Sequence, residues 1–247
     1  MSRAMRGVVF LGSLMVVAAL VWQFTSRRTA PEVPAAPSIS TGVMWVERSA
    51  EWAASSVQAY RLAGAHVESA AQGRAARSWA VILDADETVI SNVVYQIERE
   101  LAGLPFTQDS WTAWVRRREA TPMPGSAAFL DRVQALGGVI AIVTNRLGSE
   151  CADTEAVFRQ HQLPFDAMLC RPDGTPSDKN PRFAAVAAGQ FDGAPGPLEI
   201  VAVLGDNIHD FPGQGQQLRA EGEAAFGDFG RRYFVLPNPM YGSWQPR

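Results

Sequence analysis

The sequence has few of the residues on which several common kinds of catalytic site depend. Its 247 residues include only two cysteines, Cys151 and Cys170, and only three histidines, His66, His161 and His209. The spacing of the cysteines excludes the common zinc patterns, and the chain has neither a G-x-S-x-G elbow nor a recognisable nucleophilic cysteine. A structural zinc centre and a hydrolytic triad are therefore both disfavoured. The cysteines form either a disulfide in an oxidising compartment or two buried thiols.

The chain also lacks an excess of basic charge. It has 22 lysines and arginines against 25 aspartates and glutamates, a net charge of −3, and no basic stripe in its body. Proteins that bind nucleic-acid polymers usually present such a stripe, so we expect no partner of that class. The composition is ordinary for a globular protein, with 47% apolar residues. A chain of this length can hold one α/β domain with a large core and an appendage.

One long apolar stretch without charge stands near the beginning of the chain. Residues 7–24, GVVFLGSLMVVAALVWQF, have two arginines on each side, and as a helix they would span roughly 27 Å, close to one bilayer core. A cleaved signal peptide usually has a shorter apolar stretch with a small-residue cleavage site directly behind it. We therefore expect residues 1–28 to form a transmembrane anchor, with a cleaved signal segment as the alternative. The absence of a nearby cysteine excludes a bacterial lipoprotein signal.

The segment after this stretch predicts a linker and then one folded domain. Residues 29–41 are rich in Pro, Ala and Ser, which is typical of an extended tether, and residues 42–247 follow as the domain. Apolar residues at steps of three and four from Val43 to Val67 predict a long amphipathic N-terminal helix. Ser40 or Thr41 is available as its N-cap.

The body of the domain alternates short apolar runs with helical patterns. The apolar runs predict strands at residues 79–83, 138–144, 167–170, 199–205 and 232–237. The helical patterns lie at residues 125–137, 151–162, 181–191 and 209–222. This alternation predicts an α/β fold, with a mostly parallel sheet between helices. Residues 92–123 are too long for a simple connection and predict a small helical cap.

Polar residues gather where the predicted strands end. In an open parallel sheet, ligands bind beyond the carboxyl ends of the strands, and this is where the sequence places Asp84, Asp86, Thr88, Thr144, Asn145, Arg146, Asp206, Asn207 and Asp210, with Lys179 and Arg182 at the start of a helix. We expect these side chains to converge, with His209 either lining the site or structural. Glu87 is expected to be a solvated neighbour, and Thr88 to shape the turn around the two acids.

The acidic residues predict a Mg²⁺ site. Mg²⁺ prefers hard oxygen ligands and keeps room for water and phosphate, so Asp84 and Asp206 are expected to share the ion, with the Asp86 main-chain carbonyl as a third ligand. An EF-hand calcium loop beginning at Asp84 would need glycine and glutamate where Val89 and Tyr95 stand. That alternative is excluded.

Four motifs in order resemble those of the haloacid dehalogenase (HAD) superfamily of phosphatases. They are D-x-D-x-T after a strand, Thr-Asn-Arg after a hydrophobic run, K-x-x-R and G-D-N-x-x-D. The stretches VLGDNIHDF and FVLPNPMYGSWQ are similar to the class C acid phosphatases of subfamily IIIB, the bacterial lipoprotein type that acts on 5′-nucleotides, and the similarity covers nearly all of residues 43–245. The resemblance implies a Rossmann-like HAD fold and a Mg²⁺-dependent hydrolase of small phosphomonoesters. It also implies export, with the domain at residues 42–247 anchored to the membrane and lying in the periplasm or outside the cell.

The resemblance implies distinct tasks for the acids. Asp84 would be the nucleophile that forms an aspartyl-phosphate. Asp86 would protonate the leaving group and then activate water. Asp84, Asp86 and Asp206 would hold the metal, and Asp210, behind them, would position Lys179 or a metal-bound water.

The remaining residues would bind the substrate. The phosphate ligands implied are Thr144, Asn145 and Lys179, with Arg182 behind them. In the resembling nucleotidases two aromatic rings sandwich the base, and Trp111 and Tyr241 stand at the matching positions.

Two other functions stay open from the sequence. One is a broad-specificity acid phosphatase for sugar or aryl phosphates, and the other is a non-catalytic binding or storage protein on the same scaffold. The intact Asp84 disfavours the second. The chain departs from the family in lacking the lipid-modified cysteine, and in having Ser91 and Val94 where an acidic residue and often a proline occur. The sequence does not indicate an oligomeric state.

Overall fold

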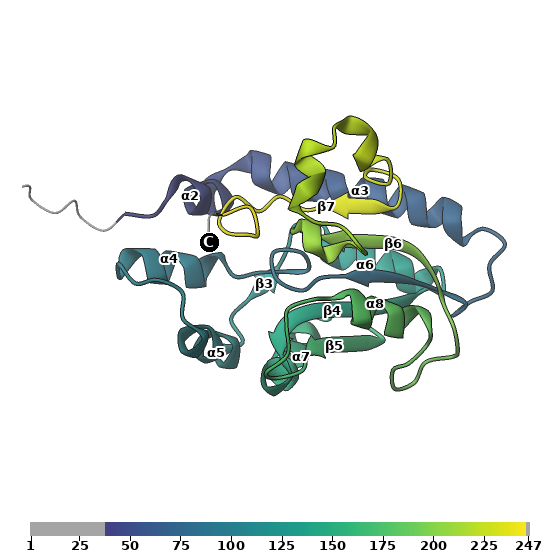
Figure 1. The fold of residues 1–247 in the computed structure, drawn as a ribbon. Coiled ribbons are helices and arrows are strands. Elements are labelled where there is room, and N and C mark those ends of the chain that lie inside the picture. The colour runs from purple at the N-terminus through teal and green to yellow at the C-terminus, as the bar shows by residue number, and fades with distance from the viewer. Residues whose placement is uncertain (1–37, 246–247) are drawn as a thin grey trace, which may run out of the picture. The chain divides into compact units, whose positions relative to one another are not determined.

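The computed structural model describes residues 38–245, shown as the coloured ribbon in Figure 1. The predicted anchor, residues 1–28, and all but the last four residues of the predicted linker, residues 29–41, lie outside these residues and stay predictions. Within the described part of the chain, no helix has both the length and the apolar character needed to span a bilayer.

The centre of the domain is a five-stranded, fully parallel sheet. Its strands in chain order are β1 (Trp79–Leu83), β4 (Val139–Leu147), β5 (Ala167–Arg171), β6 (Glu199–Gly205) and β7 (Tyr233–Val235). They are arranged in the order β5-β4-β1-β6-β7, and every neighbouring pair is parallel. All five residues of β1 are buried, as the continuous apolar run WAVIL predicts for a strand covered on both faces.

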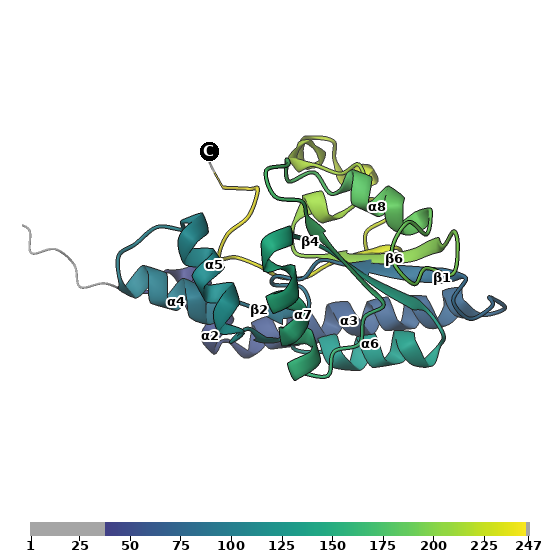
Figure 2. The ribbon, with the colours of Figure 1, turned by 90° about the horizontal axis from the view of Figure 1, so that it is seen from below.

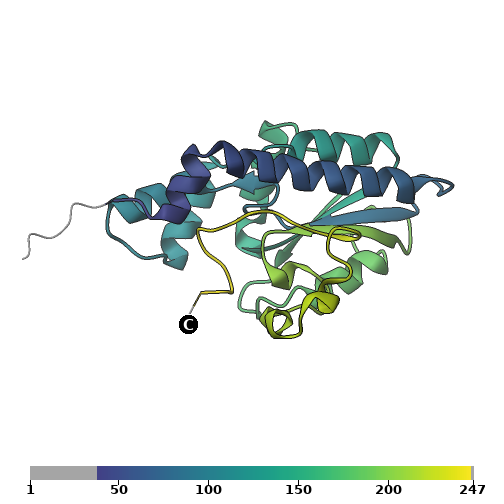
Figure 3. The same ribbon diagram turned by 90° about the horizontal axis from the view of Figure 1, so that it is seen from above.

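Helices cover both faces of this sheet, as Figures 2 and 3 show. They are α3 (Ala50–Ala71), α6 (Ser126–Ala135), α7 (Cys151–Gln160) and α8 (Asn180–Ala187). Val81 and Leu83 of β1 belong to the core formed with α3, α6 and α7, whereas Ala80 and Ile82 belong to the core formed with α8. Because alternate residues of a strand point to opposite faces, one short strand anchors both layers. The predicted α/β fold is confirmed.

Two predicted helices differ in the structure. The helix expected from Val43 to Val67 is broken into α2 (Thr41–Arg48) and α3, because Ser49 accepts a hydrogen bond from Trp52 N at 3.1 Å and caps α3. Ser40 caps α2 in the same way.

The helix predicted over residues 209–222 is wrong. This segment and its continuation form only the short turns η2 (Ile208–Asp210), η3 (Gln216–Ala220) and η4 (Glu223–Phe226). Pro212 lacks a backbone donor, and Gly213 adopts a φ of 70°, which a right-handed helix excludes.

A small cap lies beyond the carboxyl end of β1. It contains α4 (Val93–Leu101) and α5 (Gln108–Arg117), between the short strands β2 (Ile90–Ser91) and β3 (Thr121–Pro122), which pair antiparallel. The Glu150 carboxylate at the start of α7 is buried and accepts hydrogen bonds from Thr112 Oγ1 at 2.6 Å and Gln108 Nε2 at 3.1 Å. Both donors belong to α5, so this carboxylate ties the cap to the core.

Candidate active site

A tight turn after β1 presents the first two aspartates. Main-chain hydrogen bonds from Val89 N and Ile90 N to Ala85 O close the turn. Glu87 adopts a φ of 51° within it, a conformation uncommon outside glycine. Asp84 is held at 8% exposure, and Asp86 stands two residues later with its side chain partly exposed.

Three carboxylates from two segments, the turn after β1 and the stretch after β6, meet here. Asp84, Asp206 and Asp210 each place one carboxylate oxygen within 4.8 Å of the others. Leu83 and Leu204 are partners in the β1–β6 register, so the residues after these strands are brought together by the sheet. Gly205 is needed for this packing, because a Cβ there would lie only 2.3 Å from the Asp210 Cβ.

Burial and mutual repulsion oppose ionisation of this cluster. Burial, together with Asp210 and Asp86, raises the Asp84 pKa to about 7, although Lys179 acts in the opposite direction. The Asp206 pKa is raised well above its usual value, first by burial and then by Asp210 and Asp84. Three converging carboxylates, two of them with raised pKa values, are a donor set that fits a hard divalent cation.

Of the predicted metal ligands, two lie in the carboxylate cluster, and the Asp86 side chain lies outside it. Asp84 and Asp206 share the cluster, as the sequence predicts, and Asp210, predicted to stand behind it, joins them. The Asp86 side chain faces other partners, so its role as a ligand through the main-chain carbonyl stays a prediction.

Lys179 is buried between two of the acids. It stands at the N-cap of α8, is 3% exposed, and its Nζ donates to Asp210 Oδ1 at 2.6 Å and also to Asp84 Oδ1. Burial alone would lower the Lys179 pKa, but the two carboxylates outweigh that effect and raise it. The Lys179 ammonium group is therefore charged beside the Asp84 carboxyl group.

Asp86 is held by a separate buried network. Arg146 Nη2 donates to Asp86 Oδ1 at 2.7 Å and to Asn92 Oδ1 at 3.0 Å, while Asn92 Nδ2 donates to Asp86 Oδ1 at 2.8 Å. Trp114 Nε1 from the cap also donates to Asn92 Oδ1, at 2.8 Å. The orientation of Asp86 thus depends on the end of β4 and on the cap.

The end of β4 supplies the remaining predicted phosphate ligands. Arg182 donates to the Thr144 main-chain oxygen and, through Nη2, to Asn145 Oδ1 at 2.6 Å. Asn145 lines the pocket, and Thr144 is fully buried behind it, with its hydroxyl accepting a hydrogen bond from Arg146 N at 3.1 Å. Arg182 thus contacts the segment that bears both residues, and its predicted role behind the phosphate ligands stays a prediction.

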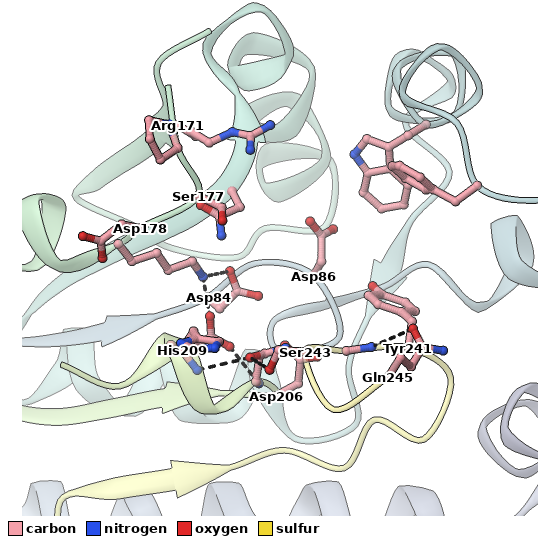
Figure 4. Close-up of a pocket in the computed structure, with 18 of the residues that line it drawn as sticks. Asp84, Asp86, Arg171, Ser177, Asp178, Asp206, His209, Tyr241, Ser243 and Gln245 are labelled. Carbon is pink, nitrogen blue, oxygen red and sulfur yellow. Dashed lines mark hydrogen bonds and ion pairs between the residues drawn. The ribbon is translucent and has the colours of Figure 1, made fainter. Parts of the chain in front are cut away.

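A pocket of about 970 Å³ opens over these residues. Figure 4 shows the acids on its floor and aromatic side chains on its wall. Trp111 and Tyr241 both line it, with Phe106 and His209. The other two histidines contact main-chain oxygens, His66 that of Val201 at 2.9 Å and His161 that of Ala120 at 3.0 Å. These two contacts are structural.

The prediction that Glu87 is solvated is wrong. Its side chain is 1% exposed, and it accepts hydrogen bonds from Asn92 N at 2.6 Å and from the Tyr241 hydroxyl. Burial and the charge of Asp86 raise its pKa to about 8. No local signal could have shown this, because Tyr241 is 154 residues away in the chain.

The two cysteines are paired. Cys151, the first residue of α7, forms a disulfide with Cys170 in β5, with a Cα–Cα distance of 6.0 Å. This settles in the structure what the sequence leaves open. The disulfide fixes the end of β5 against the segment that bears Glu150.

Comparisons with known proteins identify a family and a fold for this chain. The chain matches the family model for the HAD superfamily, subfamily IIIB (acid phosphatase), over residues 15–244. The class C acid phosphatase from Bacillus anthracis has a TM-score of 0.70 and 26% identity, covering 82% of this chain and 84% of that one. The structure of a class C acid phosphatase from the same organism with tungstate bound gives 0.70 and 25%, with the same coverage.

A plant protein is also related. The stem 31 kDa glycoprotein of Glycine max is 26% identical over 167 residues, which cover 65% of this chain. The match spans 58% of the length of that relative.

Proposed function

The chain belongs to the acid phosphatase family of HAD subfamily IIIB, and from that membership we propose that it hydrolyses small phosphate monoesters with Mg²⁺. The family predicted from the motifs is confirmed. One observation carries the proposal: buried Lys179 bonds to both Asp84 and Asp210, and Asp206 completes a cluster of three carboxylates beside it. A buried nucleophile, a fixed cation and a cation-binding cluster at the floor of one pocket suit phosphoryl transfer.

The reaction we propose has two displacements at phosphorus. An Asp84 carboxylate oxygen attacks the phosphorus, the bond to the ester oxygen breaks, and protonated Asp86 gives its proton to that leaving oxygen. Asp86 then takes a proton from water as the water oxygen attacks the phosphorus of the aspartyl-phosphate. Inorganic phosphate leaves, Asp84 is free again, and Asp86 is again protonated.

The surrounding residues position these two acids and the phosphate. Arg146 and Asn92 fix the Asp86 carboxyl group, and Lys179 offsets negative charge at Asp84. Arg182 binds Asn145 Oδ1, which leaves the Asn145 amide hydrogens available as donors to phosphate. Mg²⁺ held by the carboxylate cluster would neutralise charge on the acids and on the phosphate oxygens.

We propose 5′-nucleotides as the substrates. Trp111 and Tyr241 come from distant parts of the chain and line the same pocket as the acids. Stacking on an aromatic ring contributes about 1–3 kcal/mol per base. Phe106 adds a third ring, 6.3 Å from Trp111 between ring centroids.

A substrate panel tests the proposal. Phosphate release from AMP, NMN, a sugar phosphate and an aryl phosphate should be measured with and without Mg²⁺, for the purified chain and for Trp111→Ala. We expect Trp111→Ala to lose turnover of the two nucleotides selectively. An equal loss on all four substrates would leave a broad-specificity phosphatase, and no release from any would leave a binding or storage protein.

We also propose that the domain is exported and tethered to a membrane by residues 7–24. Their apolar sequence supports a membrane anchor, and the Cys151–Cys170 disulfide supports an oxidising compartment. Fractionation of cells with labelling of free thiols tests this. Two free thiols in a soluble cytosolic fraction would contradict it.

A further inference from the structure

Among the residues that the structure describes, Arg171 has no protein partner, unlike the other cations near the pocket. It is the last residue of β5 and lines the pocket. Its Nε is buried without a hydrogen-bond partner, and within residues 38–245 its side chain makes neither an ion pair nor a hydrogen bond. By contrast, Lys179, the other lysine or arginine that lines the pocket, is held by Asp84 and Asp210. A buried donor without a partner is costly, so this arginine has unused hydrogen-bonding capacity beside the pocket.

The acids of the following loop are engaged elsewhere. Asp173 Oδ1 accepts a hydrogen bond from Ser149 N at 3.2 Å. Asp178 Oδ1 accepts from Asn180 N at 2.9 Å and from its side-chain amide at 2.7 Å. Both carboxylates therefore stabilise main-chain turns, and within the described residues neither forms a hydrogen bond or ion pair with Arg171. The charge of Arg171 only adds to the lowering of the Asp173 pKa by its hydrogen bonds with Ser149.

The backbone that bears Arg171 is fixed from two sides. Arg171 pairs with Leu147 in the β4–β5 register, and the preceding Cys170 is bonded to Cys151. A side chain at a strand end with a disulfide directly before it is well preorganised for binding, since little backbone freedom is lost when a ligand arrives.

The pocket extends well beyond the acid cluster. Its volume of about 970 Å³ lies at the upper end of the range of roughly 300–1,000 Å³ for small-molecule sites. Figure 4 shows Arg171 on the side of the pocket opposite Asp206, with Asp84 and Asp86 between them. A phosphate bound at Asp84 would leave Arg171 to meet another part of the same substrate.

We propose that Arg171 binds a second anionic group, phosphate or carboxylate, of the phosphate monoester that reacts at Asp84. This inference rests on the proposed function. A guanidinium group presents paired donors that match both oxyanions and binds them more strongly than neutral groups. The preferred substrates are then bifunctional, such as nucleoside bisphosphates, rather than simple monophosphates.

Binding in a non-hydrolysing background tests the proposal independently of turnover. In Asp84→Asn, calorimetry compares adenosine 3′,5′-bisphosphate with AMP, and phosphoserine with phosphoethanolamine, which lacks only the carboxylate. We expect at least one doubly anionic member to bind roughly 10- to 100-fold more tightly than its partner, and the added Arg171→Ala substitution to remove that preference. A preference within the adenosine pair would identify phosphate as the second anionic group, and one within the phosphoserine pair would identify carboxylate.

Further variants serve as controls for this test. Arg171→Lys should restore part of the preference, because a lysine keeps the charge without the paired donors. As a control, Arg159→Ala removes an exposed arginine of α7 paired with Glu155 and should leave the preference intact. If Arg171→Ala does not fold, Arg171→Gln replaces it. No preference with Arg171 present, or a preference that survives its removal, overturns the inference. Failure of the wild-type chain to hydrolyse any phosphate monoester would instead overturn the proposed function.

Discussion

Arg146 Nη2 and Nε lie 2.7 and 3.0 Å from Asp86 Oδ1, across 60 residues of the chain. The arginine is 2% exposed, and its Nη1 also donates to Thr154 Oγ1 at 3.2 Å. A guanidinium group can hold all of these contacts at once because its donors point in fixed directions. The buried Arg146 side chain at the end of β4 therefore orients Asp86, the proposed acid–base group.

Arg146→Lys should lower kcat more than it raises KM. A lysine ammonium group cannot make the paired hydrogen bonds to Asp86 and the one to Thr154 at the same time. We therefore expect kcat to fall roughly 10- to 100-fold, because the Asp86 carboxyl group is misoriented. Steady-state kinetics with AMP measures this. Arg77→Lys, at an exposed ion pair with Asp166, is the matched control and should change neither constant. Equal kcat for Arg146→Lys and wild type would show that the paired hydrogen bonds from Arg146 to Asp86 do not contribute to catalysis.

Removing one acid of the cluster should weaken cation binding. Asp206→Asn deletes a charge from the group formed with Asp84 and Asp210, and we expect the Kd for Mg²⁺ to rise at least roughly tenfold. Calorimetric titration of chelator-treated protein measures it, and Mg²⁺ should also raise the wild-type Tm. Asp192→Asn removes an acid outside both the cluster and the pocket lining and is the control. Unaltered Mg²⁺ affinity in Asp206→Asn would place the ion elsewhere.

The free energy of unfolding of the metal-free protein should fall as pH rises. The folded-state pKa of Asp84 is about 7, against an ordinary value of 3.8, so between these values the folded state binds more protons than the unfolded state. By linkage its contribution to stability is lost as pH rises through this window, on the order of a few kcal/mol, and Glu87 extends the fall toward pH 8.

Urea denaturation at about pH 5 and about pH 8 with a chelator present measures the difference. Mg²⁺ should reduce it, because the cation favours the charged carboxylates, and Asp84→Asn should reduce it without metal. Stability that increases across this window in the chelated protein would contradict the raised pKa values.

Two substitutions separate the roles of Tyr241. Tyr241→Phe keeps the ring but removes the hydrogen bond to buried Glu87, which should cost about 1 kcal/mol of unfolding free energy with little change in KM for AMP. Tyr241→Ala also removes the ring, so KM for AMP should rise while KM for an aryl phosphate changes less. Denaturant unfolding and kinetics on both substrates distinguish the effects. A KM for AMP that is unchanged in Tyr241→Ala would exclude stacking.

The sequence predicts the sheet and the place of the site because both depend on local patterns. Continuous apolar runs such as WAVIL indicate buried strands, and the polar residues after each run must gather at one edge of a parallel sheet. Asp84 and Asp206 could be paired on that reasoning alone. Ser49 could have been recognised as a competing N-cap, since serine satisfies free donors at helix starts.

Other features depend on contacts between distant segments. Glu87 is buried and accepts a hydrogen bond from Tyr241, 154 residues away, whereas its neighbouring acids suggest exposure. Arg171 looks like an ordinary charged residue after a strand until the absence of a partner is visible in the fold. The helix wrongly predicted after Asp210 is a different case, because Pro212 and Gly213 are local signals against a helix that the sequence already contains.

The central claim is that Asp84 is the nucleophile of a phosphate monoester hydrolase. Phosphate release from AMP in the presence of Mg²⁺ by wild type and by Asp84→Asn tests it most directly, with Tm as the check on folding. We predict release by the wild type and a loss of at least about 1,000-fold in Asp84→Asn. Measured without Mg²⁺, the Tm of the variant should be no lower than that of the wild type, because the substitution removes a repelling buried charge. Wild-type rates in a folded Asp84→Asn protein would contradict the account.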